Sequence, residues 1–160
     1  MAETPTMESG QPVRNGDSYD ADSIQVLKGL EELRGLGMQD CFKLLHFHLG
    51  SQIPNIRIVK TAINEAARIY AELVKEGAGL EYIDVGGGLG VDYDGSRSAF
   101  DSSTNYSLQE YTNDIVYYVA DVCNAEKVPH PDIVSESGRA IVAHHSVLVV
   151  EVFGAIEKVH

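Results

Sequence analysis

Residues 81–90 read Glu81-Tyr-Ile-Asp-Val-Gly-Gly-Gly-Leu-Gly90, an apolar run that leads into the three consecutive glycines 86–88, and the rest of the chain is interpreted from them. This pattern is typical of a buried strand that ends in a loop of bare backbone. Glycine can adopt a positive φ and lets a ligand approach main-chain N–H groups, which can form a nest for an anion. A tight turn without a ligand is the simpler alternative.

Three classes of phosphate or nucleotide loop are compared with this stretch. A dinucleotide fingerprint requires glycine at the position that Val91 occupies, so that class fails. Asp84 followed by Gly86, Gly88 and Gly90 fits the glycine-rich loop of S-adenosylmethionine-dependent methyltransferases. The third class is the phosphate-binding loop of a (β/α)8 barrel. The flanking sequence must decide between the last two.

Composition describes an ordinary globular chain of one domain, with 160 residues, 44% of them hydrophobic and 22% charged. Twelve basic against twenty-four acidic residues give a net charge of −12, which disfavours nucleic acid and anionic membranes as partners. The sequence shows neither a membrane-spanning run nor a secretory signal, so we expect a cytoplasmic protein. Cys41 and Cys123 are expected to be reduced and half-buried.

The chain divides into a polar leader, residues 1–21, and a folded portion, residues 22–160. Helices are predicted from a cap at Asp22, over 56–75, and from a capping box at Ser107. Their apolar stripes are Ile24, Leu27, Leu30 and Leu33; Val59, Ile63, Ala66, Tyr70 and Leu73; and Leu108, Tyr111, Ile115, Val119 and Val122. Strands are predicted over 41–49, 80–85 and 132–136, with a polar loop at 92–106 and a last apolar, β-branched run at 147–152.

Strands that alternate with helices predict an α/β fold with parallel pairing and right-handed crossovers. Three strands make neither a closed barrel nor a complete doubly wound sheet, so the chain is expected to be a slice of a larger fold. The carboxyl ends of parallel strands lie on one side, which would bring residues 46–51, 84–90 and 135–139 together.

Together these strand ends offer what pyridoxal phosphate requires. Its phosphate needs donors, and its pyridine nitrogen needs a carboxylate that raises the pKa of that nitrogen. An imidazole can stack on the ring. The candidates are the Gly87 and Gly88 amides, Ser51 and Arg139 for the phosphate, Glu136 for the nitrogen and His48 for stacking.

Simpler interpretations of the same residues remain open at this point. His46 and His48 could be a metal-binding pair at a strand end, although a histidine there is more often a hydrogen-bonded core residue. Glu136 and Arg139 could form only a local ion pair.

Three stretches, LLHFHLGSQIPNIR (44–57), YIDVGGGLGVDYDGSRS (82–98) and SESGRAIVAHHSVLV (135–149), resemble the biosynthetic, pyridoxal-phosphate-dependent arginine decarboxylases of the alanine-racemase-like fold. The resemblance covers about residues 27–150. It implies the last part of a pyridoxal-phosphate-binding (β/α)8 TIM barrel, about three βα units. The implied reaction converts L-arginine to agmatine and CO2 in polyamine and spermidine biosynthesis.

The resemblance also implies roles for individual residues. His48 would stack on the cofactor and Glu136 would meet the pyridine nitrogen, and these two count as catalytic. The phosphate would be held by Ser51, Gly86, Gly87, Gly88, Gly138 and Arg139. The expected cofactor is pyridoxal 5′-phosphate, with Mg²⁺ allowed as a second one, and the whole enzyme is expected to be a homo-oligomer.

Two departures from the family pattern set the expectation for this chain alone. None of its lysines stands in the Pro-x-Lys-x-Asn context of the family's Schiff-base lysine, and the sequence lacks the family's C-terminal β-domain. We therefore expect the chain to hold the cofactor without decarboxylating arginine. The alternatives are an inactive pyridoxal-phosphate-binding fragment or homologue, and an S-adenosylmethionine-dependent methyltransferase.

Overall fold

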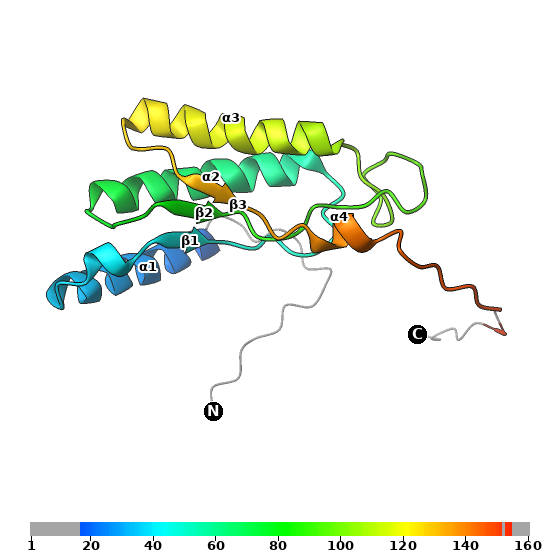
Figure 1. The fold of residues 1–160 in the computed structure, drawn as a ribbon, viewed down its shortest axis with the longest axis horizontal. Helices are drawn as coiled ribbons and strands as arrows, with labels where there is room; N and C mark the ends of the chain where they lie inside the picture. Colours follow the sequence, from blue (N-terminus) through cyan, green and yellow to red (C-terminus); the bar gives the residue numbers. More distant parts are fainter. Residues whose placement is uncertain (1–16, 152, 155–160) are drawn as a thin grey trace.

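A computed structural model describes residues 17–151 and 153–154, which form a three-stranded sheet with helices packed on it (Figure 1). The elements in order are α1 (Asp17–Gly35), η1 (Gln39–Cys41), β1 (Leu44–His46), α2 (Ile56–Lys75), β2 (Tyr82–Asp84), α3 (Leu108–Glu126), β3 (Asp132–Val134) and α4 (Gly138–Val142). The strands pair in parallel in the order β1-β2-β3. The predicted parallel α/β arrangement is confirmed.

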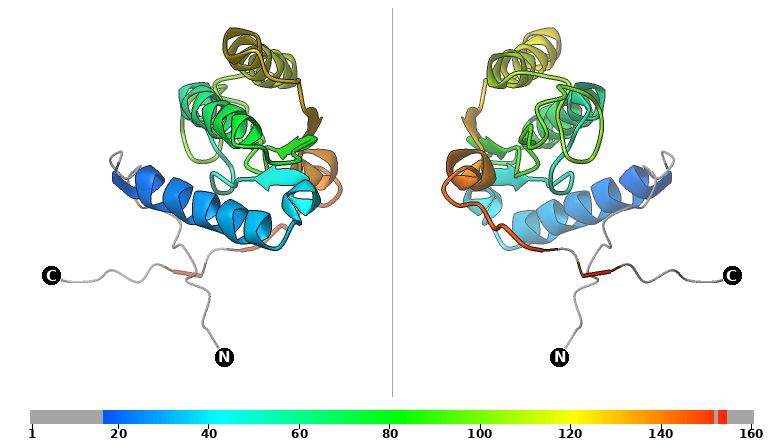
Figure 2. Two further views of the ribbon diagram at one scale, coloured as in Figure 1. Left: turned by 90° about the vertical axis from the view of Figure 1, so that its left-hand side faces the viewer. Right: turned by 90° about the vertical axis from the view of Figure 1, so that its right-hand side faces the viewer.

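The three long helices lie in an arc on one side of the sheet, and no helix among the described residues runs along the other side (Figure 2). Side chains alternate along each strand, so Leu45 and Ile83 face the helices and are 8% and 0% exposed. Leu44 and Tyr82 face the opposite side and are 40% and 37% exposed. A curved sheet with one helical layer outside it is the geometry of a barrel segment.

Helix α2 supplies the centre of the core. Asn55 caps it by accepting a hydrogen bond from the Arg57 amide at 3.0 Å, and its bounds match the prediction. Its whole predicted stripe is buried, and Ile63, Tyr70 and Leu73 are each 1% exposed. Burying each such side chain stabilises the fold by about 1.5–3 kcal/mol.

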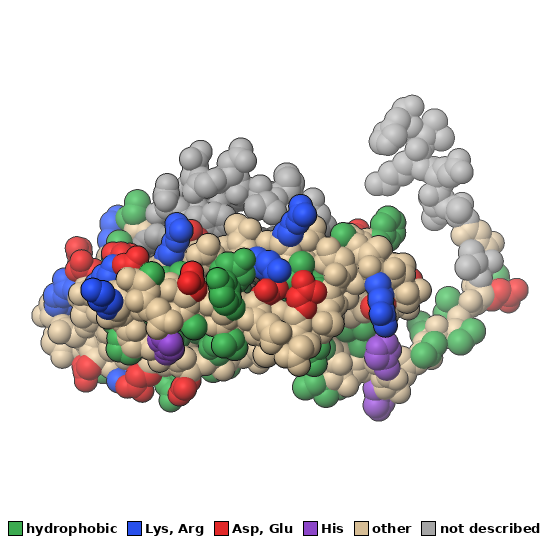
Figure 3. Space-filling view, turned by 90° about the horizontal axis from the view of Figure 1, so that it is seen from above, with side chains coloured by type: hydrophobic (Ala, Val, Ile, Leu, Met, Phe, Trp, Pro, Cys, Tyr) green, Lys and Arg blue, Asp and Glu red, His purple; other side chains and the backbone are tan. Residues whose placement is uncertain are grey.

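Helix α3 begins after Ser107, whose hydroxyl accepts a hydrogen bond from the Glu110 amide at 3.1 Å, so the predicted cap is confirmed. Its stripe is buried except for Leu108, which lies in the first turn and is 65% exposed. Lys60 of α2 lies 3.1 Å from Asp114 of α3. Seen from the α3 side, acidic and basic side chains are interspersed with apolar ones (Figure 3).

The first helix differs from its prediction. It begins at Asp17, so Asp22 lies inside α1 and is not its cap, and residues 17–21 are helical. The rest of the predicted leader, residues 1–16, lies outside the described residues. Leu30 is 1% exposed, whereas Ile24 and Leu27 are 51% and 40% exposed, so most of the predicted stripe is not buried.

The strands are shorter than predicted. Residues 39–41 form the 3₁₀ turn η1, and each strand has three residues because pairing ends where the backbone turns into the loops at the strand ends. Residues 147–150 of the last apolar run belong to no strand and are exposed. Both cysteines are free, but Cys41 is exposed and Cys123 is buried, so neither is half-buried as predicted. In the part of the chain that the structure describes, no helix has the length and apolar character needed to cross a membrane.

Candidate functional site

The glycine turn after β2 is built for close packing against the segment after β1. Gly86 and Gly88 have φ of 64° and 101°, and the Asp84 carboxylate accepts a hydrogen bond from the Gly86 amide at 2.9 Å. A Cβ on Gly86 would lie 2.3 Å from the Phe47 carbonyl oxygen, and one on Gly88 would lie 2.8 Å from that of Gly50. Protein packing therefore requires these two glycines, independently of any ligand.

His48 is held by the middle glycine of the triplet. The Gly87 amide donates a hydrogen bond to His48 Nδ1 at 3.1 Å. A backbone N–H can only donate, so Nδ1 carries the lone pair, and in the neutral ring the proton is on Nε2. This contact corrects the prediction that the Gly87 amide is free for a phosphate. It fixes the orientation of an imidazole whose side chain is otherwise exposed.

The third strand end joins the other two. The Glu136 amide donates to the Gly86 carbonyl at 2.9 Å, and the Arg139 guanidinium donates to the Ser51 hydroxyl at 2.6 Å. Both contacts link the segment after β3 to the strand ends before it. Gly138 is the first residue of α4, and a Cβ placed there would meet nothing within 4 Å, so packing does not require glycine at this position.

Glu136 and Arg139 do not form the local ion pair that was one simple interpretation. Within the described ranges 17–151 and 153–154, neither side chain takes part in an ion pair, and both are exposed. An uncompensated guanidinium beside a hydroxyl is suited to an oxyanion.

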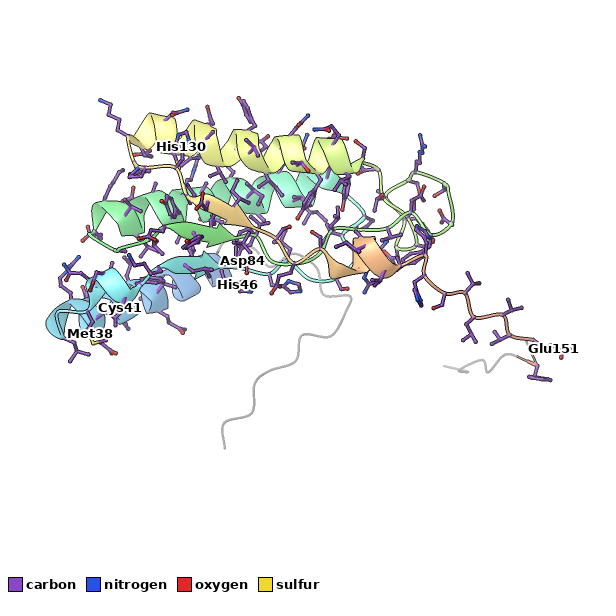
Figure 4. The ribbon with its side chains drawn as sticks, viewed as in Figure 1. Met38, Cys41, His46, Asp84, His130 and Glu151 are labelled. Carbon is purple, nitrogen blue, oxygen red and sulfur yellow. The ribbon has the colours of Figure 1, made fainter. Side chains whose placement is uncertain are left out.

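His46 pairs with a carboxylate of its own sheet. Its Nδ1 lies 3.0 Å from Asp84 Oδ2 on the uncovered side of the sheet, and Figure 4 shows the two residues close together. No group of three or more His, Cys, Asp or Glu side chains that could hold a metal ion occurs among the residues described. His46 is thus hydrogen-bonded, as the simpler of its two interpretations predicts, but its side chain is 45% exposed and is not in the core as that interpretation expects. The structure gives no support to Mg²⁺ in this part of the chain.

Two residues with no predicted role also contact the glycine turn. The Tyr106 hydroxyl accepts a hydrogen bond from the Gly90 amide, and the Gln52 amide group bonds to both backbone groups of Val91. These contacts join positions 16 and 39 residues apart, and nothing in the local sequence marks them.

The fold and these contacts resemble those of α/β barrel proteins that bind phosphorylated ligands. A guanidinium, a hydroxyl and a glycine turn gather at the carboxyl ends of parallel strands, where α/β barrels bind phosphorylated ligands. The methyltransferase alternative has only the glycine turn in its favour.

The chain belongs to the pyridoxal-dependent decarboxylases, because the model of that family's pyridoxal-binding domain matches residues 21–143. All three strand ends lie within this range. The predicted family is therefore confirmed, and pyridoxal phosphate is the cofactor of that family.

Individual relatives point to one branch of the family. The chain is 62% identical over 134 residues to the biosynthetic arginine decarboxylase of Rhodopirellula baltica, covering 84% of this chain and 20% of the relative. It is 58% identical over 131 residues to that of Aeromonas hydrophila, covering 82% and 21%.

The structural comparison agrees. The biosynthetic arginine decarboxylase SpeA from Campylobacter jejuni superposes with a TM-score of 0.66 at 42% identity, over 73% of this chain and 20% of that chain. This chain therefore corresponds to a part of that enzyme. The chain spans about a fifth of the length of the relatives it matches.

Proposed function

We propose that this chain is the part of a biosynthetic arginine decarboxylase that holds the phosphate and the ring of pyridoxal phosphate. The parent reaction would convert L-arginine to agmatine and CO2 in polyamine biosynthesis, in the cytoplasm and as a homo-oligomer. The observation that carries the proposal is 62% identity to such an enzyme over a range of 134 residues. Mg²⁺ is not part of the proposal.

The donor set suits the phosphate. The Arg139 guanidinium has donors to spare beyond the one it gives to Ser51 at 2.6 Å, and a guanidinium can bind an oxyanion through two parallel hydrogen bonds. Among the residues described, the Gly88 amide makes no protein hydrogen bond, so it is available as a further donor. Charge-assisted hydrogen bonds of this kind contribute about 1.5–3 kcal/mol each.

His48 and Glu136 are the residues for the ring. The Gly87 amide occupies Nδ1 of His48 and so fixes the plane of an imidazole that can stack on an aromatic ring. Glu136, in the segment that follows β3, has an exposed carboxylate. A carboxylate beside the pyridine nitrogen would keep that nitrogen protonated. When bound, pyridoxal phosphate supplies the electron sink that the loss of CO2 requires.

The test is a titration of this chain with pyridoxal phosphate and, separately, with S-adenosylmethionine, followed by cofactor absorbance and by calorimetry. We expect heat only with pyridoxal phosphate. Arg139→Ala should weaken binding about 10- to 100-fold, since it removes a charge-assisted contact. Arg68→Ala, on the exposed side of α2, is the matched control and should leave the affinity unchanged.

Two results would contradict the proposal, and a third would contradict the expectation that the chain alone does not decarboxylate arginine. Binding of S-adenosylmethionine without pyridoxal phosphate would favour the methyltransferase alternative. Equal losses in Arg139→Ala and Arg68→Ala would mean that the phosphate binds elsewhere. Steady release of CO2 from arginine by the isolated chain, with a borohydride-trapped lysine adduct, would show that one of its own lysines serves the cofactor.

A further inference from the structure

The long polar loop, residues 92–106, is closed on itself around a buried serine. Ser103 is 0% exposed, and its hydroxyl donates to Asp92 Oδ1 at 2.6 Å while accepting a hydrogen bond from the Ser98 amide at 3.0 Å. The Asn105 amide donates to the Pro54 carbonyl at 3.0 Å. Two of these hydrogen bonds hold the loop closed on itself, and the third ties its end to the turn that follows β1.

Tyr106, the last residue of this loop, joins the two turns through one oxygen atom. Its hydroxyl donates to the Ile53 carbonyl at 2.7 Å and accepts from the Gly90 amide at 3.0 Å. Burial raises the pKa of Tyr106, which keeps the donated proton on the hydroxyl. The Tyr106 ring stacks on the Tyr111 ring of α3 with centroids 6.1 Å apart, and this contact fixes the orientation of the ring that carries the hydroxyl.

Gln52 makes a second link between the same turns. Its side-chain amide donates to the Val91 carbonyl at 2.7 Å and accepts from the Val91 amide at 2.9 Å. A further hydrogen bond reaches the Ser103 carbonyl at 3.3 Å. The backbone of Gln52 has a φ of 54°, an uncommon value outside glycine, and the next residue back is Ser51.

We propose that Tyr106 and Gln52 are positioning residues, which hold the Ser51 turn and the glycine turn at the separation that a phosphate requires. The inference rests on the proposed function, because those two turns carry the proposed phosphate donors. Donors from separate segments bind one anion well only if their separation is held to a fraction of an ångström. The polar loop thereby receives a role that its sequence did not show.

The matched variants are Tyr106→Phe and Tyr70→Phe. Each removes one tyrosine hydroxyl that donates to a backbone carbonyl, that of Ile53 or that of Pro129 at 3.1 Å. Pro129 precedes β3, so Tyr70 acts at the opposite end of the strands. Gln52→Met is the third variant, because it keeps the side-chain length but neither hydrogen-bonding group.

Two measurements are made on the full chain: the dissociation constants of pyridoxal phosphate and of inorganic phosphate, and amide hydrogen exchange without ligand. We expect Tyr106→Phe to raise both dissociation constants about 10-fold and to accelerate exchange at Gly90. Gln52→Met should do the same with accelerated exchange at Val91. Tyr70→Phe should lower the melting temperature without changing affinity.

The proposal is overturned if Tyr106→Phe and Gln52→Met bind both probes as tightly as Tyr70→Phe does. It is also overturned if exchange at Gly90 and Val91 stays at the wild-type rate. If the unmodified chain binds no pyridoxal phosphate, the proposed function fails by itself. The exchange data and the affinity for inorganic phosphate then still decide whether the two residues hold the turns.

Discussion

Replacing Gly86 by alanine tests whether the glycine triplet is fixed by packing. Gly86 has a φ of 64°, and an alanine forced into this left-handed region costs about 1–2 kcal/mol. Its Cβ would also lie 2.3 Å from the Phe47 carbonyl oxygen, a backbone atom that cannot rotate away. Relief of this contact would move Phe47, whose amide donates to the Asp84 carbonyl at 3.2 Å. Weakening that hydrogen bond adds up to about 0.5–1.5 kcal/mol, so we expect a total loss of about 1.5–3.5 kcal/mol.

Gly95→Ala is the control, because Gly95 also has a positive φ of 74° but a Cβ there meets nothing within 4 Å. It should cost only the conformational part, about 1–2 kcal/mol. The assay is urea unfolding followed by far-UV circular dichroism, with both variants compared at equal protein concentration. If Gly86→Ala is no less stable than Gly95→Ala, the close packing of the triplet against the β1 end is not what requires glycine.

Three further predictions concern other parts of the chain. Hydrogen bonds from neighbouring serines lower the pKa of Asp94 from 3.8 to about 2. The contribution of the Asp94 carboxylate to loop stability is therefore complete above the unfolded pKa and is lost as the pH falls through about 2. Hydrogen exchange in the loop should rise over that pH range in the wild type and not in Asp94→Asn. Burial raises the pKa of the Cys123 thiol, so iodoacetamide should modify Cys41 and spare Cys123, and peptide mapping that finds equal labelling would contradict this. The uncovered sheet face, which carries Tyr82, should make the isolated chain self-associate. Light scattering should therefore be lower for Tyr82→Ser than for the wild type. The control Tyr117→Ser, which changes an exposed residue of α3, should leave light scattering unchanged.

Elements with strong local signals were predictable from the amino-acid sequence. Helix α2 was predicted with its observed bounds because its apolar residues recur at helical spacing and its flanks carry end signals. The Ser107 cap likewise depends on residues three apart, whose geometry the local backbone dictates. Parallel pairing followed from the alternation of strands and helices. The motifs also identified the family, since their residues and order are properties of the chain alone.

The sequence-based prediction was wrong where neighbouring elements, and not local residue preference, determine which side chains are buried. Helix α1 begins at Asp17, before its predicted cap Asp22, and its apolar stripe is buried only at Leu30 among the three residues Ile24, Leu27 and Leu30. A stripe predicts which face can be buried, but the neighbouring elements decide how much of it is covered. The sequence contains no information at positions 24 and 27 about which surfaces lie beside them.

The contacts that hold the site together are visible only in the folded chain. The glycines suggested a ligand cradle, whereas the coordinates show Gly86 packed against Phe47 and the Gly87 amide engaged by His48. The links from Gln52 and Tyr106 to the glycine turn join residues far apart in the chain. Hydrogen bonds depend on distance and angle in space, so residue types can nominate the donors at a strand end, while the folded backbone determines which of them meet.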